Sequence, residues 1–147
     1  MLSIGIASDH GGLELKSHII KSLPDIQFID LGTNSSDSVH YPQFADKLCT
    51  NILNGSVKSG ILVCGTGIGI SIRANRYMGI RAALVYDSFS AEMAKAHNNA
   101  NVICLGGRTT SNNDAIKYIQ AWRSASFESG RHSQRIKMLD APLNNFN

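Results

Sequence analysis

Short apolar runs alternate with segments of helical periodicity along almost the whole chain, and no other feature constrains the fold as much. The apolar runs predict strands at 2–7, 26–31, 59–64, 80–86 and 101–106. Strands separated by helical segments form parallel sheets with helices on both faces. The sequence therefore predicts an α/β fold: a single-domain three-layer α/β/α sandwich with a five-stranded parallel Rossmann-like sheet.

Residue signals mark the limits of the helices. Pro24 stops the first, Pro42 suits the first turn of the second, and Ser88 suits the N-cap of the fourth. The predicted helices cover 13–23, 43–54, the segment from the turn at 65–69 to about residue 77, 88–97 and roughly 112–125, with a last helix after Gly130.

The length of 147 residues fits one domain, which we assign to residues 1–141. We expect residues 142–147 to form a loose tail. Because 43% of the residues are hydrophobic and 17% are charged, the composition is that of a globular protein rather than a disordered one.

Several signals bear on location and partners. No apolar run approaches the ~20 residues of a membrane helix, and the N-terminus lacks the features of a signal peptide. Cys49, Cys64 and Cys104 are too widely spaced for a disulfide framework or a zinc knuckle. We therefore expect a cytoplasmic protein without a membrane partner. The net charge of +3 is a weak surplus that suits anionic small molecules as well as nucleic acid.

The strongest local signal is Cys-Gly-Thr-Gly-Ile-Gly-Ile-Ser at 64–71, where the third predicted strand turns into a helix. Closely spaced glycines let backbone N–H groups approach an anion, and a helix N-terminus favours a thiolate at Cys64. A P-loop would need a lysine at this turn, and phosphatase and dinucleotide loops would need arginine or glycine in place of Ile70. A dinucleotide site with Asp87 as the ribose-binding acid, and a merely tight turn, stay open as alternatives.

Two further groups of residues could join this loop. Ligands of open α/β sheets bind beyond the carboxyl ends of the strands, where the connections reverse. Asp9 and His10 follow the first strand, and they face the 64–71 loop if the first and third strands are neighbours. Arg131 and Arg135 lie one turn apart on the last helix, a spacing that suits a phosphate. The simpler interpretations are a helix cap for the first pair and a solvated basic face for the second.

His97 and Asn98 end the fourth helix, whose C-terminal dipole favours a protonated imidazole, although local sequence alone favours a helix C-cap. Arg123 and Lys137 add basic charge near the last helix. No aromatic stacking platform or recognition motif accompanies this charge, so we predict no nucleic-acid partner.

Taken together, the motifs resemble one known family, the ribose-5-phosphate isomerases of type B, which also includes allose- and galactose-6-phosphate isomerases. The resemblance runs from the first strand to about residue 137. It rests on Ser8-Asp9-His10-Gly11-Gly12, Tyr41-Pro42, Cys64-Gly-Thr-Gly-Ile-Gly-Ile-Ser71, Ala74-Asn75, Gly79-Ile80-Arg81-Ala82, His97-Asn98, Asn101-Val102 and Gly130-Arg131-His132-Ser133-Gln134-Arg135.

The resemblance implies an aldose–ketose isomerase of the non-oxidative pentose phosphate pathway, which interconverts ribose 5-phosphate and ribulose 5-phosphate without a metal or cofactor. It assigns the catalytic base to Cys64, since the glutamate that serves one branch of the family is replaced in this chain by Ile70. His97 would open the sugar ring with help from Thr66, and Asp9 would position the anomeric hydroxyl.

The resemblance also assigns substrate binding. Backbone amides of the 65–71 segment would stabilise the enediolate. The implied binding residues are Asp9, His10, Tyr41, Gly65, Thr66, Gly67, Ile68, Gly69, Ser71, Asn98, Arg108, Arg131 and Arg135, of which His10 and the three arginines would hold the phosphate.

Topology adds one expectation. His97 precedes the fifth strand and so belongs to the amino edge of the sheet, whereas Cys64 belongs to the carboxyl edge. We therefore expect His97 and Asn98 to enter the site of a partner subunit in a homodimer, with assembly into a tetramer left open. The alternative functions are isomerisation of a 6-phosphohexose and a non-catalytic sugar-phosphate or nucleotide-binding module.

Overall fold

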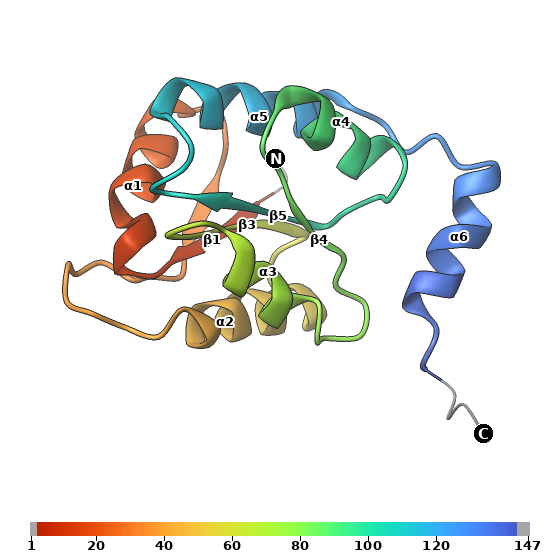
Figure 1. Ribbon diagram of the computed structural model, residues 1–147, viewed down its shortest axis with the longest axis horizontal. Helices are drawn as coiled ribbons and strands as arrows, with labels where there is room; N and C mark the ends of the chain where they lie inside the picture. The colour runs from red at the N-terminus through yellow and green to blue at the C-terminus, as the bar shows by residue number, and fades with distance from the viewer. Residues whose placement is uncertain (1–2, 144–147) are drawn as a thin grey trace.

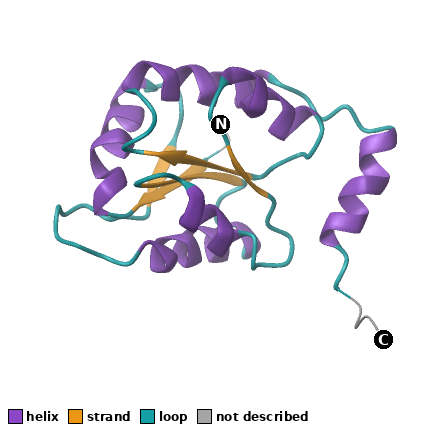
Figure 2. Ribbon diagram, in the orientation of Figure 1, coloured by secondary structure: helices purple, strands orange, loops and turns teal. Residues whose placement is uncertain are grey.

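A computed structural model describes residues 3–143 and shows a parallel five-stranded sheet in the order β2-β1-β3-β5-β4 (Figures 1 and 2). The strands are β1 (Ile4–Ser8), β2 (Phe28–Asp30), β3 (Ser59–Cys64), β4 (Ala82–Leu84) and β5 (Val102–Gly106). The predicted fold class is confirmed. Residue 2 of the first predicted strand and residues 144–147 of the predicted tail lie outside the described residues.

Six α-helices and one short 3-10 helix connect these strands in the described part of the chain. They are η1 (His10–Gly12), α1 (Leu13–Ser22), α2 (Tyr41–Leu53), α3 (Ile68–Ala74), α4 (Ser88–Ala96), α5 (Asn112–Ser124) and α6 (Arg131–Asp140). The predicted N-cap at Ser88 is wrong, because Asp87 caps α4 by accepting from the Ser90 N–H at 2.6 Å. The two edge strands are shorter than predicted, since each pairs on one side only.

Two apolar cores hold the sandwich together, one on each face of the sheet. Successive residues of β3 alternate between them: Ile61 and Val63 face α1, α4 and α5, whereas Leu62 and Cys64 face α2 and α3. Because both faces are covered, β3 is apolar without polar alternation, as expected for a central parallel strand. Burial on both sides gives the strand ends a rigid base for polar loops.

The strand order confirms that the first and third strands are neighbours. Ser8 of β1 pairs in register with Val63 of β3, and β3 pairs on its other side with β5. The chain turns to one side of β1 to form β2 and then crosses to the other side to form β3. The carboxyl ends of β1 and β3 are therefore the switch point of this sheet.

The last helix, α6, stands apart from both helical layers, beyond the end of the molecule opposite the strand arrowheads (Figures 1 and 2). An ion pair of 2.7 Å between Arg81 Nη1 and Asp140 Oδ2 ties it to the sandwich. Met138 and Leu139 on this helix are 73% and 61% exposed. No described helix has the length and apolar character needed to span a membrane.

Candidate active site

Three loops meet at the switch point and are held together by backbone hydrogen bonds. The Asp9 N–H donates to the Val63 carbonyl at 3.2 Å, which ties the first loop to β3. The Gly107 N–H donates to the Cys64 carbonyl at 2.7 Å, and the Arg108 N–H to the Gly65 carbonyl at 2.9 Å. The loops after β1, β3 and β5 therefore form one connected surface.

Cys64 is the last residue of β3 at this surface, and it is 4% exposed. Its Sγ atom accepts from the Gly67 N–H at 3.2 Å. Gly67 has φ +78°, and a Cβ there would lie 2.7 Å from Leu84 Cδ1, so the turn requires glycine. The Gly67 N–H therefore holds the Cys64 sulfur in a fixed position within the loop.

The other two cysteines, Cys49 and Cys104, lie in the core. Burial raises the pKa of Cys49 to about 12 and holds the pKa of Cys104 well above its ordinary value. Both remain protonated thiols at neutral pH. Among the three cysteines, Cys64 alone borders the switch-point loops.

Asp9 and His10 stand beside Cys64, each with one side-chain atom fixed. Asp9 Oδ1 accepts from the Gly12 N–H at 3.1 Å, so this carboxylate also caps the 3-10 helix. The Val39 N–H donates to His10 Nδ1 at 3.2 Å. Because a backbone N–H can only donate, Nδ1 is the accepting nitrogen of His10, and Nε2 is the one that can donate to a ligand.

Arg108 and Tyr41 border the same surface. A Cβ at Gly65 would lie 3.0 Å from Nη1 of Arg108, so the guanidinium packs against the glycine loop. A Cβ at Gly69 would lie 2.5 Å from the Tyr41 hydroxyl oxygen, which places this ring over the first turn of α3. Both close approaches depend on the absence of a side chain at the glycines.

In the glycine loop and the start of α3 (residues 65–71), some backbone N–H groups donate to acceptors of the same segment and others are left open. The Ile68 N–H donates to Thr66 Oγ1 at 3.3 Å, and the Ser71 N–H donates within the helix to the Gly67 carbonyl. The Ser71 hydroxyl donates to the Ile68 carbonyl. Helix geometry leaves the N–H groups of Gly69 and Ile70 without intrahelical acceptors, so these are the groups open to an anion.

Asp87, the alternative ribose-binding acid, is already engaged in hydrogen bonds within its own helix end. Its carboxylate is engaged by Ser90 in a capping box at the start of α4. These hydrogen bonds lower the pKa of Asp87, the backbone bond from Ser90 most of all. The group is explained as a helix cap.

His97 and Asn98 lie at the opposite edge of the sheet from Cys64. His97 is the C-cap of α4, ahead of β5, and its ring stacks on that of His132 with a centroid separation of 4.2 Å. Asn98 lines a cavity of about 440 Å³ that also contacts Arg81 and Leu139. A single chain does not bring these residues to the switch point.

Arg131 and Arg135 are on α6, which Figure 1 places on the side of the molecule away from the strand arrowheads. The structure thus separates the predicted site residues into two groups. Those at the switch point are Asp9, His10, Tyr41, Cys64, Gly65, Thr66, Gly67, Ile68, Gly69, Ser71 and Arg108; those at the amino edge and on α6 are His97, Asn98, Arg131 and Arg135.

One supporting residue carries no sequence signal. Lys16 is 1% exposed, and its Nζ contacts Asp30 Oδ1 and the Thr33 carbonyl, each at 2.6 Å. It anchors the start of the loop that brings Val39 to His10. A lysine within a helical segment normally predicts a solvent-facing position, so only the packed structure identifies this role.

Known proteins share this arrangement along nearly the whole chain. Residues 4–139 match the model of the family described as Ribose/Galactose Isomerase. The chain belongs to this family. The resemblance inferred from the motifs is therefore confirmed.

Individual family members agree in sequence and in structure. The chain is 39% identical over 143 residues to ribose-5-phosphate isomerase B of Escherichia coli, covering 96% of each. It matches the ribose 5-phosphate isomerase of Thermotoga maritima with a TM-score of 0.92 and 44% identity, covering 95% and 97% of the two chains. The enzyme of Mycoplasma genitalium with bound ribulose-5-phosphate matches with a TM-score of 0.90 and 40% identity, covering 95% and 94%.

Proposed function

We propose that this protein is an aldose–ketose isomerase that interconverts D-ribose 5-phosphate and D-ribulose 5-phosphate. The observation that carries the reaction type is the Cys64 sulfur, which accepts from the Gly67 N–H beside Asp9 at the switch point. The relatives named ribose-5-phosphate isomerase B, and the relative with bound ribulose-5-phosphate, support a phosphopentose substrate. A cytoplasmic location and a place in the pentose phosphate pathway belong to the same proposal.

The chemistry is a proton transfer between neighbouring carbons. After the ring opens, the Cys64 thiolate removes the C2 proton of the aldose, and the electron pair forms the C1–C2 double bond of an enediolate. The O2 hydroxyl proton passes to O1, and the protonated thiol returns its proton to C1 as the C2 carbonyl forms, which yields the ketose. The free N–H groups at the start of α3 stabilise the oxyanion that develops between these steps.

Two residues of the same chain are available for the phosphate. His10 Nε2 can donate without carrying a charge, because Val39 holds Nδ1 as an acceptor. The Arg108 guanidinium supplies a positive charge at the neighbouring loop. Tyr41, over Gly69, is placed to close one wall of the pocket.

The remaining groups are proposed to come from a second copy of the chain. His97 would protonate the ring oxygen, with Asn98 beside it, and Arg131 and Arg135 would complete the phosphate site. Support comes from their position at the edge opposite Cys64 and from the exposed apolar side chains of α6. We therefore infer a homodimer with shared sites. Whether dimers pair into tetramers is a separate question for measurement of mass in solution.

Subunit exchange tests the shared site. Purified Cys64→Ala and His97→Ala proteins should each be inactive, and mixed dimers should regain activity because one of their two sites is intact. Absence of recovery, despite exchange demonstrated by differently tagged subunits, would contradict the shared site.

Substrate comparison tests the function itself. Turnover on ribose 5-phosphate should exceed turnover on allose 6-phosphate and galactose 6-phosphate. If ribose 5-phosphate were the poorest substrate, the assignment within the family would be wrong. A non-catalytic binding module would instead bind the sugar phosphate without turnover in the native chain, and Cys64→Ala would keep that affinity.

A further inference from the structure

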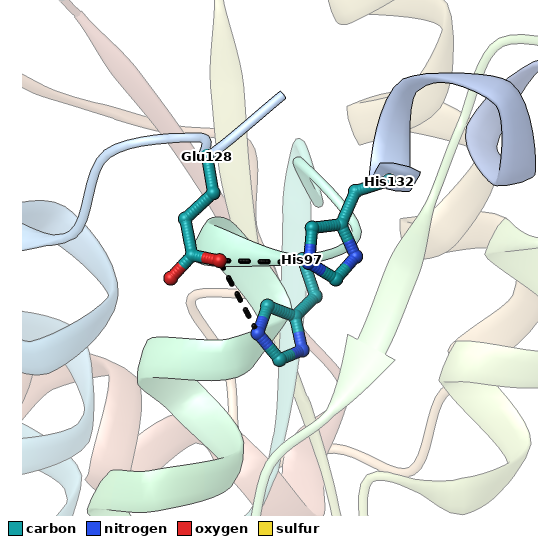
Figure 3. Close-up of side chains that lie close together, drawn as sticks. All are labelled: His97, Glu128 and His132. Carbon is teal, nitrogen blue, oxygen red and sulfur yellow. Dashed lines mark ion pairs between the residues drawn. The ribbon is translucent and has the colours of Figure 1, made fainter. Parts of the chain in front are cut away.

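Three side chains from separate segments converge beside α6, away from the switch-point loops (Figure 3). They are His97 at the end of α4, Glu128 in the connection that follows α5, and His132 in the first turn of α6. Their ligand atoms all lie within 4.8 Å of one another. Two imidazole nitrogens and a carboxylate oxygen are a donor set that zinc takes in proteins.

The distances within this cluster are too long for good hydrogen bonds. Nε2 of His97 lies 3.6 Å from Glu128 Oε2, and Nε2 of His132 lies 3.5 Å from the same oxygen. A nitrogen-to-oxygen hydrogen bond is shorter, at about 2.7–3.2 Å. Neighbouring ligands of a tetrahedral ion with bonds of about 2.1 Å stand about 3.4 Å apart, which is close to the two nitrogen-to-oxygen separations in this cluster.

We propose that His97, Glu128 and His132 form a binding site for a divalent transition-metal ion of the zinc type. The two rings stack nearly parallel, with an interplanar angle of 13°, so metal binding requires each imidazole to turn about its side-chain bonds until its lone pair points at the ion. Water supplies the fourth ligand, because Glu128 is exposed and leaves the site open to solvent.

Charges on α6 and on Glu128 act in opposite directions on a bound cation. Arg131 and Arg135 flank His132 on the same helix. The two arginines oppose a cation, and the Glu128 carboxylate supplies the negative charge that offsets this repulsion.

Occupation of the site has a consequence for the reaction. An ion on Nε2 of His97 holds the imidazole beside α6 and removes one of its nitrogens from proton transfer. The ion would then inhibit ring opening rather than assist catalysis. This consequence rests on the proposed function, whereas the metal site itself does not.

Titration of the chelator-treated, full-length protein tests binding without reference to turnover. The Cys64→Ala background removes the thiol as a competing ligand. In that background, zinc binding measured by calorimetry should weaken in Glu128→Gln and His132→Gln by more than the ~100-fold that is the upper end for loss of a residue that only orients a ligand. His18→Gln, which removes an imidazole from α1, should leave the affinity unchanged.

Cobalt provides a second readout of the ligands. Co²⁺ should produce the visible bands of a four-coordinate ion, and these should disappear in Glu128→Gln. Unchanged zinc affinity in both cluster variants would overturn the proposal. A second result would also overturn it: the native chain shows only a thiolate-to-cobalt absorption band, and Cys64→Ala loses that band. Such a band would place the metal at the switch point.

Activity measurements test the inhibition separately. Zinc should reduce turnover of ribose 5-phosphate, and a chelator should restore it. Glu128→Gln should resist zinc when compared with its own metal-free rate. Tight binding without inhibition would overturn the inhibitory role alone. Absence of turnover in metal-free native protein would instead contradict the proposed function, while the titration would still decide the metal site.

Discussion

The two edges of the sheet hold their polar side chains in different ways. At the carboxyl edge, backbone hydrogen bonds join the three loops, and Cys64, His10 and Asp9 each have a fixed partner. At the amino edge, His97 and His132 contact Glu128 only at 3.5–3.6 Å, and α6 stands outside the sandwich. The first region is ordered by its own chain, whereas the second has side chains positioned for a partner or a ligand.

The largest expected effect is at Cys64. Cys64→Ala should lower kcat for ribose 5-phosphate by about 10³-fold, within the range that a positioned base contributes. Cys104→Ala is the matched control, because it removes a buried thiol of the same sheet without touching the loops. It should lower the melting temperature and keep most of the turnover. Equal loss of kcat in both variants would mean that the sulfur acts through packing.

Gly67→Ala should have the next largest effect. Its φ of +78° and its close approach to Leu84 and Leu105 give the new methyl group no room. We expect kcat to fall by about 10²-fold as the loop shifts. Gly55→Ala separates backbone strain from crowding, because Gly55 has φ +82° with no atom within 4 Å of its Cβ position. It should cost about 1 kcal/mol of stability and leave kcat unchanged.

Lys16→Met tests whether the buried lysine that anchors the loop after β2 contributes to stability. The substitution removes the contacts of Nζ with Asp30 and Thr33. We expect the free energy of unfolding to fall by about 1–3 kcal/mol. Lys21→Met, at an exposed position of the same helix, should change it by less than about 0.5 kcal/mol. Similar unfolding midpoints in urea for the two variants would contradict an anchoring role for Lys16.

The smallest effect is expected at the amino edge. Burial lowers the pKa of His132 below its ordinary value of 6.5, so the unfolded chain binds a proton more readily than the folded one. Stability should therefore decrease as the pH falls through about 6.5 toward the lowered folded pKa. His132→Gln should flatten this part of the profile of urea midpoint against pH, and His18→Gln should not. Parallel profiles for native protein and His132→Gln would contradict this direction of the pKa shift.

The fold and the switch-point residues were predictable because their signals are local. Alternating periodicities identified the strands, and parallel strands place their carboxyl ends at one edge, so Asp9 and the 64–71 loop had to meet once β1 and β3 were neighbours. The same reasoning assigned His97 to the other edge. The lengths of the edge strands were harder to predict from the sequence, because they depend on which strand pairs with them. The cap at Asp87 was harder to predict because helix ends can shift by one residue.

The sequence by itself determined the α/β class, the glycine cradle around Cys64 and the separation of His97 from it. Only the tertiary structure decided which long-range partners these groups acquire. The Val39 N–H reaches His10 across 29 residues, and Lys16 meets Thr33 across 17. The His97, Glu128 and His132 side chains meet only because α6 returns beside the end of α4. Periodicity specifies which face of an element is buried, but contacts between distant segments follow from how the packed chain closes on itself.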